Sequence, residues 1–457
     1  MNSDNNNVTI DDRQLYKKLV KIALPISVQG VVSATLGLVD NLMVGFLGEA
    51  ELAAVGIATQ IYYIHYLLLF GFASGTATFY AQFFGTKDYR NIRRTIGFAI
   101  SAATIVGVVF FIIGFFFTDG LLNIYSNDET LIAMARPYVR FCSVTFFFLG
   151  ISSPLEMAFK ATQQTKVPMV ISAVVFTTNT ALNYVFIFGK FGLPAMGIMG
   201  AALATTIARG MEVLIVLYFT GRKSNSFRGP VKDFFDWNKE MIVRIAKNAA
   251  PTTANELLWS IGQTMYVAAF SRIGTTAYAA YQAAAAIHSI FSFAAFSIGD
   301  ATLILVGEKL GEGKLEETYI LGKKLLKVGV AVGLAVGILL MICAKPLVGL
   351  FNLTDEGKYY AFMILLVYGA LTWLHLYNGI NITGTLRGGG DTTFAMIAES
   401  CCVWFVAVPM AFFGALVLHV PIYVAVLMVN TEELVKSILM TKRFKSKKWL
   451  NNVIGGL

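Results

Sequence analysis

Charged residues are scarce in this chain, since Asp, Glu, Lys and Arg together make up only 14% of its 457 residues. Soluble globular proteins carry about 25% charged residues. Hydrophobic residues make up 56% of the chain, and its mean hydropathy is +0.66. This composition excludes an ordinary soluble protein and predicts a polytopic membrane protein.

Cysteine and the common catalytic motifs are also rare or missing. The four cysteines, Cys142, Cys343, Cys401 and Cys402, lie in apolar segments without metal-ligand spacing, and we interpret them as packing thiols. No HExxH, GxSxG, P-loop or CxxC constellation occurs. The glycine-rich stretch Arg387–Asp391 lacks the P-loop lysine and follows no predicted strand, so it predicts a cytoplasmic turn. We therefore expect neither an enzyme nor a bound cofactor.

Negative charge is scarcer than positive charge, because 27 Asp and Glu stand against 36 Lys and Arg and give a net charge of +9. A nucleic-acid-binding protein often has such an excess. Basic loops on the cytoplasmic face of a membrane protein explain it better here. We expect the lipid bilayer and small molecules as partners, no nucleic acid, and a monomer.

Long apolar runs are what the chain has instead. A membrane-spanning helix needs about 20 mostly apolar residues. Twelve such runs occur, at residues 19–46, 51–84, 96–117, 131–160, 168–189, 197–220, 248–270, 276–309, 327–350, 359–385, 394–416 and 421–440. They predict an all-α membrane protein with twelve transmembrane helices.

Lysine and arginine are concentrated in alternate connections between these runs. The basic clusters are Arg13–Lys21, Lys87–Arg94, Lys160–Lys166, Arg222–Arg244, Lys314–Lys327 and Lys442–Lys448. Because Lys and Arg accumulate on the cytoplasmic side, twelve spans place both termini there. We expect a multi-pass protein of the cell (inner or plasma) membrane.

The two halves of the chain resemble each other. The polar stretch 221–246 separates an N-lobe (1–220, helices 1–6) from a C-lobe (247–457, helices 7–12). The shift that superposes Pro25 on Pro251 aligns the two halves without a gap. Six spans per half is an even number, so the halves form an internal parallel repeat. Transporters with such repeats bind their substrate between the halves and rock one half against the other.

Asp40 is the one charged residue in the apolar stretch 23–46. A carboxylate at the centre of a membrane helix costs about 2.5–3.5 kcal/mol on insertion scales. Gln29, Ser33 and Gly37 lie on the same helical face, at spacings of three and four residues. Close helix packing accounts for Ser33 and Gly37, but it does not account for an ionisable group. We therefore predict a functional role for Asp40.

The other polar residues of the first half are less informative by themselves. Asn179 and Asn183 lie four residues apart on one face of the fifth predicted span, where they either bridge helices or form part of a site. Thr205 in the sixth span readily bonds to its own backbone. Tyr138 is more often a packed ring with a satisfied hydroxyl.

Glu256 is a second carboxylate deep in a predicted span, but the repeat does not duplicate the acidic position. When Pro25 is placed on Pro251, Glu256 faces Gly30, and Asp40 faces Tyr266. A purely structural role would predict acids at equivalent positions in both halves. The asymmetry therefore favours different roles for the two lobes.

These features resemble the multidrug and toxic compound extrusion (MATE) transporters, in particular the bacterial NorM/DinF-like members. The matching motifs are LVDNLMVGFLG and LAAVG in the first two spans, GAALAT in the sixth, Pro251 with Glu256 in the seventh, and TGTLRGGGDT after the tenth. The resemblance covers essentially the whole chain. It implies a twelve-helix, two-lobed exporter of organic cations that is driven by Na⁺ or H⁺ entry.

The resemblance also implies roles for individual residues. Asp40 matches the first-helix carboxylate of an N-lobe coupling-ion site, Asn179 its fifth-helix partner and Thr205 a sixth-helix hydroxyl. Asn183 lies where some members have a second Asp, so this site is less negative. Tyr138 matches a tyrosine that lines the same cavity.

Glu256 matches a seventh-helix carboxylate of a C-lobe cation site in the NorM-like branch. That branch also uses a tenth-helix Asp, whereas Tyr359–Thr385 contains no acidic residue here. We therefore place the main coupling in the N-lobe. Glu256 is then assigned to the substrate cavity, together with four further residues: Tyr138, Gln29, Ser33 and Tyr266.

Two alternatives for the ion and two for the substrate stay open. The oxygen ligands of Asp40, Asn179 and Asn183 suit Na⁺, whereas burial favours the neutral form of a carboxylic acid and so favours a proton. Ion entry that neutralises Asp40 would weaken binding of a cationic substrate and produce antiport. The alternative is a flippase of a lipid-linked oligosaccharide or another amphipathic, lipid-like substrate in the same superfamily, which we expect to line its cavity with Arg or Lys.

Overall fold

The computed structural model describes residues 11–457, and at 293–295 it describes the backbone alone. Within these residues every regular element is a helix, and no strand occurs. The apolar runs of about 20 residues explain this, because a chain in hydrocarbon must satisfy its own backbone polar groups.

Each of the twelve predicted spans corresponds to one helix or to a chain of consecutive helices. The spans of the first half are α1 (Asp12–Gly45), α2 (Glu49–Gly85), α3 (Tyr89–Phe116), α5 (Glu129–Cys142) with α6 (Val144–Ala161), α7 (Lys166–Phe188) and α8 (Ile198–Gly221). Those of the second half are α9 (Lys239–Ser271), α10 (Thr275–Gly311), α11 (Leu315–Val348), α12 (Asp355–Gly379) with η2 (Ile380–Leu386), α13 (Thr392–Cys402) with η3 (Val403–Ala407), α14 (Val408–Phe412) and η4 (Phe413–Val417), and α15 (Ile422–Val429) with α16 (Thr431–Lys445). The short helices α4 (Thr118–Leu122) and η1 (Val231–Phe235) lie in connections.

Length and apolarity alone identify fewer spans. Among the described residues, nine helices are long and apolar enough to cross a membrane, and the pair α5–α6, bent by 45°, makes a tenth. The two spans outside this count are α9, which contains Asn255 and Glu256, and α15–α16, which contains Glu432, Glu433 and Lys436. The most polar spans of the chain therefore both lie in its second half.

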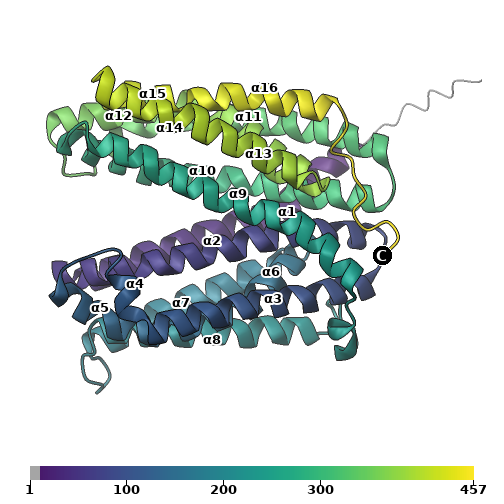
Figure 1. The fold of residues 1–457 in the computed structure, drawn as a ribbon, viewed down its shortest axis with the longest axis horizontal. Helices are drawn as coiled ribbons and strands as arrows, with labels where there is room; N and C mark the ends of the chain where they lie inside the picture. The colour runs from purple at the N-terminus through teal and green to yellow at the C-terminus, as the bar shows by residue number, and fades with distance from the viewer. Residues whose placement is uncertain (1–10) are drawn as a thin grey trace, which may run out of the picture. The chain divides into compact units, whose positions relative to one another are not determined.

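One compact unit comprises Val28–Tyr80 and Lys87–Ala249. Within it α3 packs against α6, and α7 packs against α8, which runs beside it in Figure 1. The connection after α8 folds back onto this unit, because Arg93 Nη2 lies 2.7 Å from Asp233 Oδ2 in an ion pair that is nearly buried. This connection is thus docked on α3.

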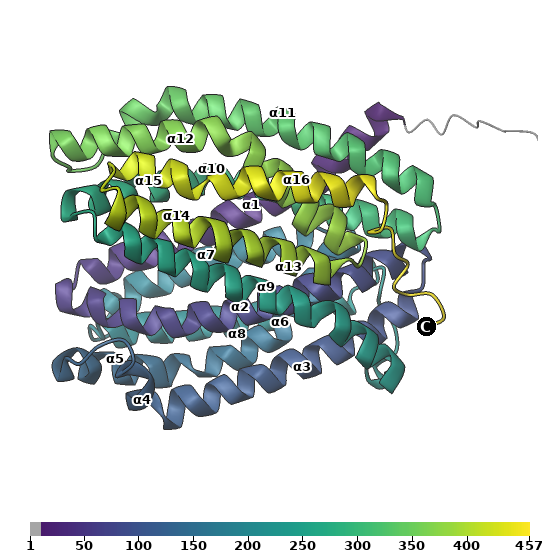
Figure 2. The same ribbon diagram turned by 45° about the horizontal axis from the view of Figure 1, so that its top comes forward.

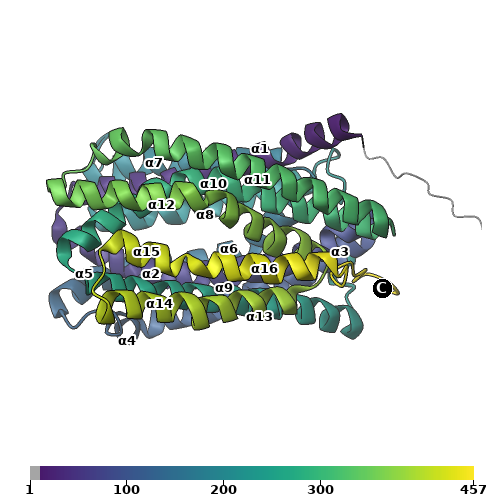
Figure 3. The same ribbon diagram turned by 90° about the horizontal axis from the view of Figure 1, so that it is seen from above.

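The second compact unit comprises the residues up to Ser27, Ala81–Thr86 and Ala250–Gly456. Helix α11 packs against α12 along its length (Figure 2). Helices α13 and α14 form one continuous helical span that lies beside α15 and α16 (Figure 3). Ten of the twenty buried residues in the core between these helices are alanines, and three of them lie on α10. Such residues let helix backbones approach closely in a membrane.

The internal repeat is visible in individual helix contacts. A Cβ atom at Gly107 of α3 would collide with the backbone of Phe146 and Phe147 of α6. The alignment of Pro25 with Pro251 places Gly107 on Gly333 of α11, which would collide in the same way with the backbone of Trp373 of α12. The α3–α6 and α11–α12 packings are therefore equivalent.

The ends of α1 and α2 pack within the second unit. Lys18 Nζ of α1 lies 2.6 Å from Glu308 Oε2 of α10. The fully buried Gln82 of α2 donates from Nε2 to the Asn451 carbonyl (3.0 Å), and its Oε1 accepts from the Val453 amide (2.9 Å). The C-terminal segment is thereby attached to the end of α2.

Candidate functional site

Four of the predicted site residues form one hydrogen-bonded group in the first compact unit. Asn183 of α7 donates from Nδ2 to Asp40 Oδ1 of α1 (2.6 Å) and to Asn179 Oδ1 (2.9 Å). Asn179 in turn donates from Nδ2 to Thr205 Oγ1 of α8 (3.3 Å). The group therefore joins three helices through side chains that the sequence singled out.

The periodicity of α7 explains why its two asparagines face this group. The buried positions of α7 are Pro168, Ile171, Val175, Asn179, Asn183 and Ile187, at spacings of three and four residues. This is the spacing of a single helical face. The face is apolar over its first half and polar where it meets Asp40.

One oxygen of the group has no partner. The buried Oδ1 of Asn183 accepts no hydrogen bond from any described residue, although Nδ2 of the same amide is used twice. Buried acceptors normally have a donor. An unpartnered amide oxygen on the asparagine that binds a carboxylate suits a hard cation such as Na⁺. A proton on Asp40 is the alternative, because a protonated carboxyl group is itself a donor.

Within residues 11–457, no group of three or more His, Cys, Asp or Glu side chains is arranged to hold a metal ion. The donor set around Asp40 has one carboxylate and several neutral oxygens. It therefore carries a single negative charge, which one monovalent ion would neutralise.

Tyr138 is 7% exposed, and it lies close enough to Asp40 and to the Cys142 thiol to interact with them electrostatically. Tyr62 of α2 donates to the Cys142 carbonyl (2.7 Å), at the bend between α5 and α6. Tyr62, Tyr138 and Cys142 thus belong to one packed cluster at this bend.

A charged cluster that the sequence analysis missed continues from Thr205 along α8. Arg209 Nη1 lies 2.6 Å from Glu212 Oε2, and the buried Ser152 of α6 donates to Glu212 Oε1 (2.6 Å). Gln29 of α1 donates from Nε2 to Glu156 Oε2 (3.0 Å). Glu156 and Glu212 carry the same signal as Asp40, because each is a carboxylate within a predicted apolar span.

The face of α1 that contains Asp40 is more open than expected. A Cβ atom at Gly37 would meet no described atom within 4 Å, and Ser33 is exposed. Close helix packing therefore does not account for these two small residues, and the assignment of Ser33 to the substrate cavity stays a prediction. Gln29, on the same face, is buried and bonded to Glu156.

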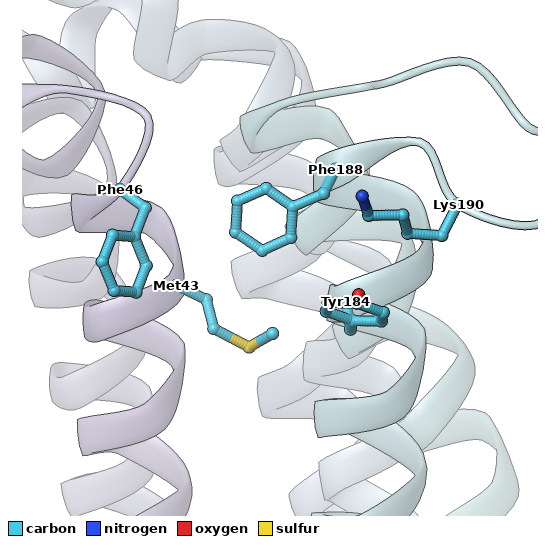
Figure 4. A pocket seen from close by; sticks show the side chains of 5 residues that line it. All are labelled: Met43, Phe46, Tyr184, Phe188 and Lys190. Carbon is cyan, nitrogen blue, oxygen red and sulfur yellow. The ribbon is translucent and has the colours of Figure 1, made fainter.

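An open pocket lies within the same unit, at the C-terminal ends of α1 and α7. Its volume is about 430 Å³, and its lining residues are Met43, Phe46, Tyr184, Phe188 and Lys190. Figure 4 shows Met43 and Phe46 on one helix facing Tyr184 and Phe188 on another. Met43 follows Asp40 by three residues and Tyr184 follows Asn183 directly, so the pocket and the acidic group are built on the same two helices.

The two remaining predicted site residues lie in the other compact unit. The Glu256 carboxylate forms an ion pair with Arg387 (Nη2–Oε1 2.6 Å), and the Arg387 side chain is 2% exposed. Within the turn predicted at Arg387–Asp391, only Gly389 and Gly390 form a turn, whereas Arg387 and Gly388 are still helical and Arg387 is buried. Tyr266 packs against Phe270, with ring centroids 5.9 Å apart.

The sequence model of the MatE family matches this chain twice, at residues 25–185 and at residues 251–413. The chain belongs to the MATE family. The two matches begin at Pro25 and at Pro251, the pair of prolines that the internal repeat superposes. The chain is therefore a multi-pass membrane transporter built from two six-helix repeats, and MATE proteins are transporters rather than enzymes.

Curated MATE relatives are similar over nearly the whole chain. The probable multidrug resistance protein YoeA of Bacillus subtilis is 25% identical over 409 residues, which cover 87% of this chain and 86% of the relative. The probable multidrug resistance protein NorM of Thermotoga maritima is 24% identical over 439 residues, which cover 95% of this chain and 93% of the relative. A solved outward-facing multidrug resistance MATE transporter of the MOP superfamily matches with a TM-score of 0.85 at 19% identity, over 96% of this chain and 99% of that one.

Proposed function

We propose that this MATE transporter exports lipophilic organic cations in exchange for inward-moving Na⁺ or H⁺, by alternating access. The observation that carries the proposal is the bond between Asn183 and Asp40 next to the unpartnered Oδ1 of Asn183. This group offers one negative charge and a free oxygen ligand inside a membrane protein.

Competition for the charge of Asp40 couples the two fluxes. A coupling ion neutralises the carboxylate and removes the attraction for a cationic substrate. A bound cation in turn opposes entry of the ion, since coupling between two ligands is reciprocal. Each ligand then shifts the two-state equilibrium by its difference in affinity for the two states.

The substrate class follows from the residues around Asp40. Met43, Phe46, Tyr184 and Phe188 form an apolar and aromatic surface. Such surfaces bind lipophilic cations through burial of apolar area and through cation–π attraction. Tyr138 and Gln29 extend the polar part of the cavity in our proposal.

We further propose that both termini lie on the cytoplasmic side and that the protein acts as a monomer without a nucleic-acid partner or a cofactor. The supporting observation is the distribution of Lys and Arg between connections.

The flippase alternative gains no support from two basic side chains of the helices, Arg209 and Arg387. Arg209 is paired with Glu212, and Arg387 is paired with Glu256. A cavity for a pyrophosphate-linked lipid needs cationic groups whose charge is not already balanced by carboxylates.

Transport in proteoliposomes tests the proposal. We expect an inward Na⁺ or pH gradient, imposed separately, to drive movement of a fluorescent lipophilic cation against the ion. Asp40→Asn should abolish this coupling, whereas Asp355→Asn, at an exposed aspartate in the first turn of α12, should not. If Asp40→Asn transports as well as the wild type, the coupling role is wrong. Movement of a lipid-linked oligosaccharide instead of a cation would favour the flippase.

A further inference from the structure

The compact unit that contains Ala250–Gly456 also contains the first turns of α1, which lie beside the start of α11 (Figures 2 and 3). The two helices run in the same direction from this end of the unit (Figure 2), and Asp12 of α1 forms an ion pair with Lys324 of α11. Four exposed basic side chains lie within five sequence positions of this ion pair: Arg13, Lys17, Lys323 and Lys327. We call these four side chains the basic face.

The side chains of the basic face lie on the same side of the two helices. Successive residues of an α-helix are rotated by about 100° around its axis. Arg13 and Lys17 are therefore rotated by about 100° and 140° from the α1 residue of the ion pair. Lys323 and Lys327 are rotated by about 100° and 60° from the α11 residue of the ion pair, but in the opposite sense. For two parallel neighbouring helices, opposite rotations away from their contact lead to one shared side.

No carboxylate within residues 11–457 forms an ion pair with the basic face. Asp11 Oδ1 accepts a hydrogen bond from the Arg13 backbone amide (2.9 Å) and so caps the start of α1. The other carboxylates of this region are already paired: Asp12 with Lys324, Glu308 with Lys18, and Glu316 with Lys447. The basic face therefore carries positive charge that the described part of the chain leaves unbalanced.

The equivalent surface in the other compact unit is covered by the chain itself. The alignment of Pro25 with Pro251 places Lys323 of α11 on Gly97 of α3. A Cβ atom at Gly97 would collide with the backbone of Phe234 in η1. A lysine at the equivalent position of α11 excludes a peptide backbone at that distance. The repeat therefore has a basic, exposed surface on α11 where α3 has a covered one.

Exposed apolar side chains continue the basic face along both helices. On α1 they are Val20 and Leu24, which are 57% and 59% exposed. On α11, Leu334, Ile338 and Ile342 follow at helical spacing and are 47%, 52% and 70% exposed. Cations at the end of an apolar, lipid-facing stripe match the build of a phospholipid, whose phosphate lies at the membrane surface and whose acyl chains lie in the hydrocarbon.

We propose that the basic face binds the phosphate of an anionic phospholipid, whose acyl chains lie along the exposed apolar side chains of α1 and α11. Lysine side chains near the membrane surface attract anionic lipids. Arg13 adds a guanidinium, which binds phosphate oxygens in pairs. The site does not include Asp40, so this inference does not rest on the function proposed above.

Native mass spectrometry of the purified protein tests the site by counting bound lipids and giving their affinities. The probe is phosphatidylglycerol, and phosphatidylcholine with the same acyl chains is the zwitterionic comparison. We expect the wild type to bind phosphatidylglycerol more tightly. Lys323→Gln together with Lys327→Gln should weaken that binding about thirtyfold and leave the binding of phosphatidylcholine unchanged. Arg13→Gln together with Lys17→Gln should weaken it from the other helix, and this pair serves as the second test if the first pair does not fold.

A charge-matched control separates a specific site from general attraction to a basic protein. Lys223→Gln together with Lys232→Gln removes the same charge from exposed positions of the other compact unit and should leave the affinity for phosphatidylglycerol unchanged. Asp40→Asn should also keep it, whatever the transport assay shows for that variant.

Three results would overturn the proposal. The first is equal affinity of the wild type for the two lipids. The second is a folded variant of the basic face that binds phosphatidylglycerol as tightly as the charge-matched control does. The third is displacement of the lipid by inorganic phosphate at an equal concentration, because the site would then recognise free phosphate instead of a lipid.

Discussion

Asn183 Nδ2 lies 2.6 Å from Asp40 Oδ1, and this hydrogen bond ties α7 directly to α1. The same nitrogen also contacts Asn179, so one amide orients the acidic side chain and the polar face of α7 together. Any change in the charge of Asp40 therefore acts on the contact between two helices.

We expect Asn183→Ala to weaken binding of the coupling ion by about tenfold or more, because hydrogen bonds to charged groups contribute roughly 1.5–3 kcal/mol. The dependence of cation transport on Na⁺ and on pH, measured separately, would show the shift for whichever ion couples. Thr177→Ala is a matched control, because this exposed threonine of α7 bonds only to the Ala173 carbonyl of its own helix. An equal loss in both variants would contradict a specific role of the Asn183 amide.

The ion pair between Arg209 and Glu212 yields a second prediction. Glu212→Gln leaves the Arg209 charge without its partner, and we expect a loss of stability of about 1–3 kcal/mol. Because Arg209 also acts electrostatically on Asp40, the freed cation should weaken coupling-ion binding. Thermal unfolding in detergent and ion-dependent transport measure the two effects.

The double variant Arg209→Met with Glu212→Gln supplies the control for that prediction. Removing both charges should restore most of the stability and of the ion affinity, because the unpaired cation is gone. A double variant that is worse than Glu212→Gln alone would show that Arg209 has another role.

The open pocket predicts an effect of Lys190 on substrate affinity. Its Nζ lies 5.9 Å from the ring centroid of Tyr184, so it competes with a cationic substrate for that ring. We expect Lys190→Ala to raise the affinity for a lipophilic cation several-fold, since cation–π contacts contribute roughly 0.5–1 kcal/mol at exposed sites. Fluorescence titration measures this, with the exposed Lys223→Ala as a charge-matched control. Unchanged affinity in Lys190→Ala would place the substrate elsewhere.

The repeat predicts equivalent packing defects at Gly107 and Gly333. Alanine at either position collides with backbone of the neighbouring helix, and overpacking of this kind costs about 1–3 kcal/mol. Gly37→Ala makes the same chemical change where the side chain meets open space, so it should be neutral or slightly stabilising. Thermal unfolding of the three variants compares them directly, and an equal shift in all three would rule out the packing explanation.

The sequence alone predicts those features of the fold that depend on residues close together in the chain. Spans appear as apolar runs because hydrocarbon requires about 20 such residues, and the shared face of Asn179 and Asn183 follows from helical periodicity alone. The family resemblance adds Asp40 to this group of residues. Their roles in transport remain predictions.

Pairings between distant segments were not accessible in this way. The sequence around Glu256 contains no sign of an ion-pair partner, because that partner, Arg387, lies 131 residues further along the chain. Glu156 and Glu212 give the same sequence signal as Asp40, since each is a carboxylate in an apolar run. For Ser33 and Gly37, the spacing shows which helical face the residues share but not what lies opposite that face.

The bonds between Gln82 and the segment at Asn451–Val453 have a practical consequence for studies of this protein. A substitution or label at Asn451 or Val453 therefore also acts on α2, although these residues lie about 370 positions further along the chain. Conversely, Gln82→Ala should release this segment, and a fluorophore at Val453 would report that release as a change in its mobility.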